Sequence, residues 1–246
     1  MKISADLFRS FVDKASLGGE ILIININFKD NEVVSQVKDV TNVAMTKVVL
    51  SKDVFEDYSP LGEIYVKNTP LFLKYLDSFK DDIKIELTDD LVLKLSDATR
   101  KVYSNLTSES VASEYVVNKD FPEIKHNFKA LMKKGDLTRT IKDLDVLKEN
   151  EVIINVTETD LQFTVGDSTI SDFISNKLGT FAVTDNRDAG KHIKIGIGRY
   201  FVSVYNVLDN DSDVELKLDN NVPIIFEETS EHMKFFCIVA PIIKED

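Results

Sequence analysis

The sequence repeats one pattern of apolar residues after 131 positions. Residues 82–95 (DIKIELTDDLVLKL) alternate apolar and polar side chains on either side of a polar centre, which is typical of two half-buried strands joined as a hairpin. Residues 213–226 (DVELKLDNNVPIIF) carry apolar side chains at the same six places. The same offset relates residues 20–25 (EILIIN) to 151–155 (EVIIN), with one residue dropped. Two matches in one register indicate an internal duplication and predict two similar domains.

Each half also carries two candidate helices. On a helical wheel the apolar side chains of each candidate fall on one face, as expected for a helix packed against a core. In the second candidate, Thr69 can serve as the N-cap and Pro70 fits the first turn. The four apolar faces consist of Leu7, Phe8, Phe11 and Ala15; Leu71, Phe72, Tyr75, Leu76 and Phe79; Leu137, Ile141 and Leu144; and Ile197, Phe201, Val204 and Leu208.

The segments between the helices read as strands, for example residues 32–50 and 101–106. We therefore predict an α+β fold, in which two similar domains of antiparallel sheets carry two helices each. The polar and acidic stretch 108–123 is the natural linker between the halves. The predicted parts are an N-terminal domain (1–110), a connecting loop (111–123) and a C-terminal domain (124–246).

The charge of the chain excludes one class of function. The chain holds 30 basic and 42 acidic residues, which gives a formal net charge of −12. This argues against a protein that binds nucleic acid through a broadly basic surface. Any DNA-binding role requires the positive charge to be concentrated on one face.

The sequence also indicates an intracellular protein. No apolar run approaches the length of a membrane span, and acidic residues near the N-terminus are unlike the apolar core of a secretory signal. The single cysteine, Cys237, excludes an intrachain disulfide framework and a thiolate zinc site. Its apolar neighbours predict a buried thiol.

A catalytic or metal-binding motif is not recognisable. His126, His192 and His232 are scattered, and none has a metal-ligand spacing or a nucleophile nearby in sequence. Residues 209–213 begin like a calcium-binding loop, but Val214 and Asn220 occupy the places where glycine and glutamate are needed. We expect neither enzyme activity nor a metal or cofactor.

The outer faces of the candidate helices mix basic and acidic residues. By itself this mixture is typical of ordinary solvated faces with pairs such as Arg9–Asp13. The basic members are Arg9, Arg139, Lys142 and Arg199, with Lys74 and Lys80 at the margins, and the acidic ones are Asp13, Asp77 and Asp143.

Two segments near the C-terminus combine a valine-proline strand, residues 221–225 (NVPII), with an apolar strand that closes on alanine-proline, residues 234–243 (KFFCIVAPII). They resemble the end of PCNA-type DNA sliding clamps, the processivity factors of DNA polymerases. Similar segments also include the central strand and loop (33–50), the end of the connecting loop (120–123), the third helix (136–144) and the start of the last helix (198–201). The resemblance spans the whole chain but is patchy in residue identity.

The resemblance implies a ring that encircles duplex DNA. In the family six similar domains close around DNA with helices lining the hole, so a two-domain chain needs three copies. The negative charge then lies outside, while basic helix faces make sliding phosphate contacts without base readout. The DNA-facing residues that this implies are Arg9, Lys14, Lys74, Lys80, Arg139, Lys142 and Arg199. Asn206 stands where the family often carries another basic residue.

The resemblance further implies an apolar pocket for short partner peptides beside the connecting loop. Lys38 and Asn42 replace residues that often help to shape this pocket, and plain core packing is the alternative interpretation of Val43 and Met45. The matching positions are Val43, Met45, Phe121, Pro122, Pro223, Ala240 and Pro241.

The expected function is therefore a homotrimeric, non-catalytic clamp in DNA replication and repair. Its expected partners are duplex DNA, a replicative polymerase, an ATP-driven clamp loader and other proteins with clamp-binding peptides. It would be located with DNA in a nucleus, in the cytoplasm or in a nucleoid. The alternatives are a subunit of a heterotrimeric clamp, an adaptor that keeps the fold without encircling DNA, and a monomeric processivity factor with an open basic face.

Overall fold

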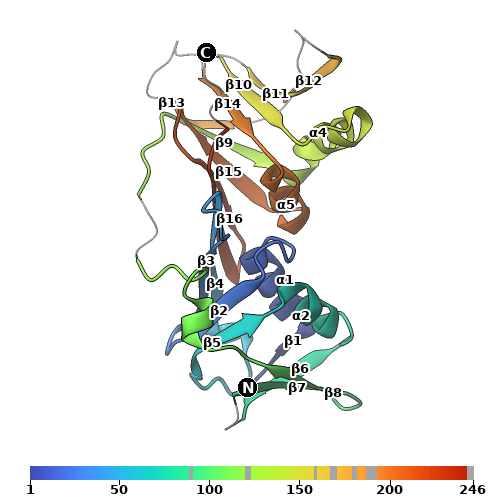
Figure 1. Cartoon of the computed structure of the whole chain (residues 1–246), viewed down its shortest axis with the longest axis vertical. Coiled ribbons are helices and arrows are strands. Elements are labelled where there is room, and N and C mark those ends of the chain that lie inside the picture. The colour runs from blue at the N-terminus through green and yellow to red at the C-terminus, as the bar shows by residue number, and fades with distance from the viewer. Residues whose placement is uncertain are drawn as a thin grey trace. The chain divides into compact units, whose positions relative to one another are not determined.

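The computed structural model describes residues 1–88, 91–119, 123–157, 160–166, 171–178 and 193–242, and the backbone of residues 182–186 (Figure 1). The chain divides into two compact units. The first consists of Met1–Phe121 and Ser230–Phe235, and the second of Pro122–Thr229 and Phe236–Asp246.

The first unit contains two antiparallel sets of strands and two neighbouring helices. Its elements are β1 (Lys2–Ser4), α1 (Ala5–Ser16), β2 (Ile23–Phe28), β3 (Glu32–Lys38), β4 (Ala44–Ser51), the 3-10 helix η1 (Lys52–Val54), β5 (Gly62–Lys67), α2 (Thr69–Leu76), β6 (Asp82–Leu87), β7 (Val92–Ser96), β8 (Lys101–Asn105) and the short α3 (Glu109–Ala112). One sheet has the order β1-β6-β7-β8, and the other strands follow the order β4-β3-β2-β5. Figure 1 shows α1 and α2 side by side.

The second unit is built in the same way. Its elements are β9 (Phe128–Lys133), α4 (Lys134–Leu147), β10 (Val152–Val156), β11 (Leu161–Gly166), β12 (Phe173–Lys177), β13 (Ala182–Asn186), β14 (Ile193–Ile197), α5 (Tyr200–Val207), β15 (Asp213–Leu218), β16 (Ile224–Thr229) and β17 (Met233–Val239), of which the first three residues of β17 belong to the first unit. The strand orders are β12-β11-β10-β14 and β13-β9-β15-β16-β17.

The strand orders confirm the duplication and the predicted α+β class. The order β1-β6-β7-β8 of the first unit corresponds to β9-β15-β16-β17 of the second, and β4-β3-β2-β5 corresponds to β12-β11-β10-β14. The predicted hairpins are also present, since β6 pairs with β7 and β15 pairs with β16, both antiparallel. β6 and β15 occupy residues 82–87 and 213–218, at the offset found in the sequence.

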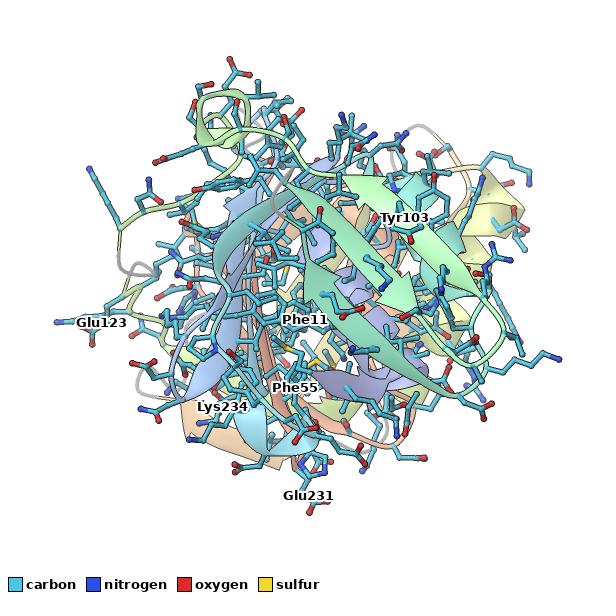
Figure 2. The ribbon with its side chains drawn as sticks, turned by 90° about the horizontal axis from the view of Figure 1, so that it is seen from below. Phe11, Phe55, Tyr103, Glu123, Glu231 and Lys234 are labelled. Atoms are coloured by element: carbon cyan, nitrogen blue, oxygen red, sulfur yellow. The ribbon has the colours of Figure 1, made fainter. Side chains whose placement is uncertain are left out.

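Apolar side chains from strands and helices meet in the interior of each unit. Phe8, Phe11 and Ala15 of α1 are fully buried, and Figure 2 shows Phe11 inside the first unit. In the second unit the ring of Phe201 lies 5.9 Å from that of Phe163 and 6.5 Å from that of Phe226, between ring centroids. These separations are usual for packed aromatic pairs.

Two expectations for α2 are wrong. The N-cap is Asn68, whose side chain accepts a hydrogen bond from the Leu71 amide, while the Thr69 hydroxyl donates to the Ile21 carbonyl at 2.6 Å. Asn68 has a φ of 54°, a left-handed conformation that Asn tolerates better than Thr. Leu71 is 40% exposed, so it is not part of the buried face.

The outer faces of the equivalent hairpins each carry an ion-pair triad, and the net charges of the two triads are opposite in sign. On β6 and β7 the Glu86 carboxylate pairs with Lys84 at 2.8 Å and with Lys94 at 2.7 Å. On β15 and β16 the Lys217 ammonium pairs with Glu215 at 3.0 Å and with Glu227. Lys84 and Glu86 correspond through the repeat to Glu215 and Lys217, so anion and cation have exchanged places.

Cys237 is fully buried in β17, and this burial raises the pKa of its thiol. None of the helices in the described ranges has the length and apolar character of a membrane-spanning segment.

Candidate nucleic-acid interface and partner surface

The exposed face of α1 and α2 is mixed in charge. The Arg9 guanidinium lies 3.6 Å from the Asp13 carboxylate and also pairs with Asp77, the C-cap residue of α2. Lys74 is exposed on α2, and Asp6 is exposed in the first turn of α1. Since two carboxylates already neutralise Arg9, this face offers little excess positive charge.

Lys14 is not on that face, so its assignment as a DNA-facing residue is wrong. Lys14 is 1% exposed, and its ammonium lies 5.4 Å from the centroid of the Phe235 ring. Phe11 and Lys14 are three residues apart and therefore lie on the same, inward side of the helix. The position of Lys80 also differs from the expectation, because α2 ends at Leu76 and Lys80 is exposed in the loop before β6.

The second unit presents its basic residues more openly. Arg139 and Lys142 are exposed and three residues apart, so they share one face of α4. Arg199 immediately precedes α5, with its guanidinium 5.0 Å from the centroid of the Tyr200 ring and 3.2 Å from the Tyr200 hydroxyl. These three side chains are the strongest candidates for phosphate contacts.

A fourth basic residue, Lys134, has a structural role that the sequence did not indicate. Its ammonium donates to the Leu208 carbonyl at 2.7 Å and to the Asn206 carbonyl at 3.4 Å, and lies 5.1 Å from the Tyr205 ring centroid. A cation at the carboxyl end of a helix is favourable because the last carbonyls lack partners. Lys134 therefore ties α4 to the end of α5.

The candidate partner surface in the first unit is a tight turn between β3 and β4. The Asp39 carboxylate is 4% exposed and accepts hydrogen bonds from the amides of Val43 and Ala44, both at 2.7 Å. This turn leaves the Val43 side chain 36% exposed, while Met45 is half-buried in β4. Lys38 donates to the Asn42 side chain at 2.5 Å across the same turn.

One candidate residue of the second unit, Pro223, contacts a buried histidine. Pro223 is half-buried, and its carbonyl oxygen lies 2.7 Å from Nε2 of His126. Ala240 and Pro241 directly follow β17 and are also half-buried. The two remaining predicted members, Phe121 and Pro122, lie outside the described residues.

A hollow of about 310 Å³ opens between α2 and β8 of the first unit. Leu71 and Tyr75 line it from α2, and Tyr103 lines it from β8. Tyr103 is 59% exposed and is labelled on the outer strand in Figure 2. In the described part of the chain, His, Cys, Asp and Glu side chains do not gather in threes as a metal site requires.

Comparison with solved structures identifies the fold of the chain. No protein-family model matches the sequence, and no curated protein matches it. The A. fulgidus PCNA bound to the C-terminal region of FEN-1 has a TM-score of 0.79 and 18% identity, covering 100% of this chain and 99% of that one. The chain has the PCNA clamp fold.

Two further PCNA structures agree over almost the full length. Proliferating cellular nuclear antigen from Entamoeba histolytica has a TM-score of 0.77 and 17% identity, with 98% of both chains covered. A PCNA2–PCNA3 complex from Sulfolobus tokodaii contains a chain with a TM-score of 0.76 and 15% identity, covering 98% of this chain and 99% of that one. The clamp fold therefore accounts for both units, as the resemblance of the sequence implied.

Proposed function

We propose that this protein is a sliding clamp, which closes as a homotrimeric ring around duplex DNA and tethers a polymerase and other DNA-processing enzymes. The observation that carries the proposal is the match of the whole two-unit chain to PCNA structures, with 98–100% of it covered. In this role the protein catalyses nothing and acts with DNA inside the cell. A clamp loader would place it on DNA.

Ring closure needs a head-to-tail contact between copies, and each unit offers a sheet edge for it. β8 ends the order β1-β6-β7-β8, and β12 ends the order β12-β11-β10-β14. Each edge bears a large exposed side chain, Tyr103 on β8 at 59% and Phe173 on β12 at 52%. An open edge with apolar side chains is a template for pairing with another strand. Pairing β8 of one copy with β12 of the next would join the copies head to tail, as a closed ring requires.

Basic side chains on the helices would meet the phosphates of the enclosed duplex. Arg139, Lys142 and Arg199 in the second unit and Lys74 and Lys80 in the first are exposed. Because a closed ring retains DNA by topology, these contacts can stay weak and independent of sequence.

Partner proteins would bind through short peptides. The A. fulgidus protein with the same fold is bound to the C-terminal region of FEN-1. In this chain the exposed Val43, the half-buried Met45 and the half-buried Pro223, Ala240 and Pro241 provide apolar side chains for such a peptide. These residues, together with Phe121 and Pro122, belong to one proposed surface by resemblance alone.

The oligomeric state and DNA retention test the proposal. Light scattering after size exclusion should give three times the chain mass of 27.8 kDa, and Tyr103→Glu should give single chains because it places a charge in the proposed contact. After loading, the clamp should remain on circular DNA and slide off the same DNA once it is linearised. Single chains for the unmodified protein, or equal retention on both DNA forms, would count against a homotrimeric ring.

A heterotrimeric clamp is the second candidate, because one structure with this fold is a complex of PCNA2 with PCNA3. In that case the chain alone would remain below the mass of a trimer, and a different clamp subunit would be needed to complete the ring.

A further inference from the structure

Strand β3 changes its neighbour halfway along its length. β2 pairs with it only at Asn27↔Val34 and Phe28↔Val33. Beyond that point the side chain of Asn25 takes the place of main-chain pairing, because its Oδ1 accepts the Gln36 amide at 2.9 Å. Asn25 is 6% exposed, and its Nδ2 donates to Glu63 at 2.6 Å, which fixes the orientation of the side-chain amide.

The beginning of the connecting segment occupies the edge that β2 leaves open. The Lys38 amide donates to the Tyr115 carbonyl at 2.8 Å, and the Val117 amide donates to the Gln36 carbonyl at 3.1 Å. Residues 115–117 therefore contact β3 through an isolated antiparallel bridge, Val37↔Val116.

The Gln36 side chain extends this contact beyond the main chain. Its Nε2 donates to the Val117 carbonyl at 3.1 Å and to the Lys119 carbonyl at 2.7 Å. Both protons of one amide are thereby used, and Gln36 is only 9% exposed. A carbonyl can only accept, so the contact requires a donor at position 36.

We propose that Gln36 is a positioning residue for the connecting segment, which it latches to β3 so that partner peptides meet the segment in a fixed conformation. This inference rests on the peptide-binding role proposed above. The latch lies beside the candidate surface, since Lys38 is opposite Met45 in the β3–β4 register. A segment that is already ordered lowers the entropy lost when a peptide binds next to it.

The test compares three variants of the full-length protein. Gln36→Glu keeps the shape but turns the donor into an acceptor facing two carbonyls, whereas Gln36→Lys restores a donor. Thr46→Val on the neighbouring strand β4 is the control, because it removes a buried hydrogen bond that does not involve the connecting segment, from Thr46 Oγ1 to the Ala15 carbonyl at 2.7 Å. Urea unfolding identifies any variant that is destabilised as a whole.

Hydrogen exchange measures the latch without any partner. In Gln36→Glu the Val117 and Lys38 amides should exchange at least about tenfold faster, because the two hydrogen bonds from Gln36 Nε2 are lost. The Ala44 amide, which donates to Asp39, should keep its rate in all three variants. Gln36→Lys and Thr46→Val should leave the Val117 rate within about twofold of the unmodified protein. An unchanged Val117 rate in Gln36→Glu overturns the latch.

Peptide affinity measures the consequence of the latch. The probe is a fluorescent synthetic peptide with the C-terminal sequence of FEN-1, titrated by anisotropy. Gln36→Glu should bind it about five- to tenfold more weakly, with Gln36→Lys and Thr46→Val close to the unmodified protein. Faster Val117 exchange with unchanged affinity overturns the positioning role. If the unmodified protein does not bind the probe, that result counts against the proposed peptide-binding function, and hydrogen exchange still decides whether the latch exists.

Discussion

Glu86 on β6 and Lys94 on β7 face each other directly across the hairpin, with Oε2 of the carboxylate 2.7 Å from the ammonium nitrogen. Hydrogen bonds from Lys84 and then Lys94 lower the pKa of Glu86 from 4.5 to about 2. Because the pKa of Glu86 is lower in the folded chain than in the unfolded chain, its ionisation stabilises the folded state at pH values above the unfolded-state pKa. This contribution disappears as the pH falls towards 2. Glu86→Gln should therefore reduce stability at pH 7 and make little difference at pH 2. Urea unfolding of both proteins at the two pH values checks this, and an equal difference at both would contradict it.

Lys217 at the centre of the other triad should respond at the opposite end of the pH scale. Burial lowers its pKa, but the hydrogen bonds to Glu227 and Glu215 outweigh this effect, so its pKa is raised above 10.5. Because the pKa of Lys217 is higher in the folded chain than in the unfolded chain, its protonation stabilises the folded state at pH values below the unfolded-state pKa. This contribution is lost as the pH rises through the folded-state pKa. Lys217→Met should thus be destabilising at pH 8 and lose much of that effect above pH 11, as followed by thermal unfolding. A difference that grows with pH would exclude this explanation.

His126 should be needed for the stability of the second unit. Its Nε2 lies 2.7 Å from the Pro223 carbonyl and its Nδ1 lies 3.1 Å from the Ile124 carbonyl, in a site where the side chain is 5% exposed. His126→Phe keeps a ring but removes the imidazole N–H that the Pro223 carbonyl faces at 2.7 Å, which should lower the free energy of unfolding by about 1–3 kcal/mol. The same change at the exposed His232 should have an effect within about 0.5 kcal/mol. Similar losses for both variants in urea would refute the role of the Pro223 contact.

Lys142 should contribute to DNA retention because of its position on α4, and not merely because it adds to the net charge of the protein. Lys142→Glu and Lys234→Glu change the net charge equally, but Lys142 is on α4 whereas Lys234 is exposed on β17. Since phosphate contacts depend on salt, Lys142→Glu should weaken DNA binding at low salt by about tenfold and reduce its salt dependence, while Lys234→Glu should bind nearly as the unmodified protein. Fluorescence anisotropy with duplex DNA at several salt concentrations gives both quantities. Equal weakening by the two variants would argue against α4 as the DNA-facing element.

The repeated fold could be predicted because its signals are local. Alternation over residues 82–95 and 213–226 requires only neighbouring residues, and both hairpins are present. The burial of Lys14 could also have been predicted from the sequence, since the position three residues after Phe11 is on the buried face of the helix. Asn68 was harder to identify, because a left-handed N-cap leaves no distinct periodic signal.

The partner surface could not be assembled from the sequence in the same way. Gln36 bonds to Val117, 81 positions away, and His126 bonds to Pro223, 97 positions away. Both side chains bond to backbone carbonyls, which every residue possesses, so no motif marks the acceptor. Resemblance to a family supplied the proposed positions of the surface, and the folded chain showed the contacts that Gln36 and His126 make.

The two triads of opposite sign show what the duplicated halves had to keep and what they were free to change. Lys84–Glu86–Lys94 carries one net positive charge, and Glu215–Lys217–Glu227 carries one net negative charge. Their first two positions correspond through the repeat, whereas Lys94 corresponds to Ile225 and Glu227 to Ser96. The strand positions demand that neighbouring charges compensate each other, but they do not demand which residue is the acid. Surface charge in this fold is therefore a variable that can be reset in compensated groups without altering the backbone. An exchange at the corresponding positions, Lys84→Glu with Glu86→Lys, Lys94→Ile and Ser96→Glu, would give the first hairpin the charge pattern of the second.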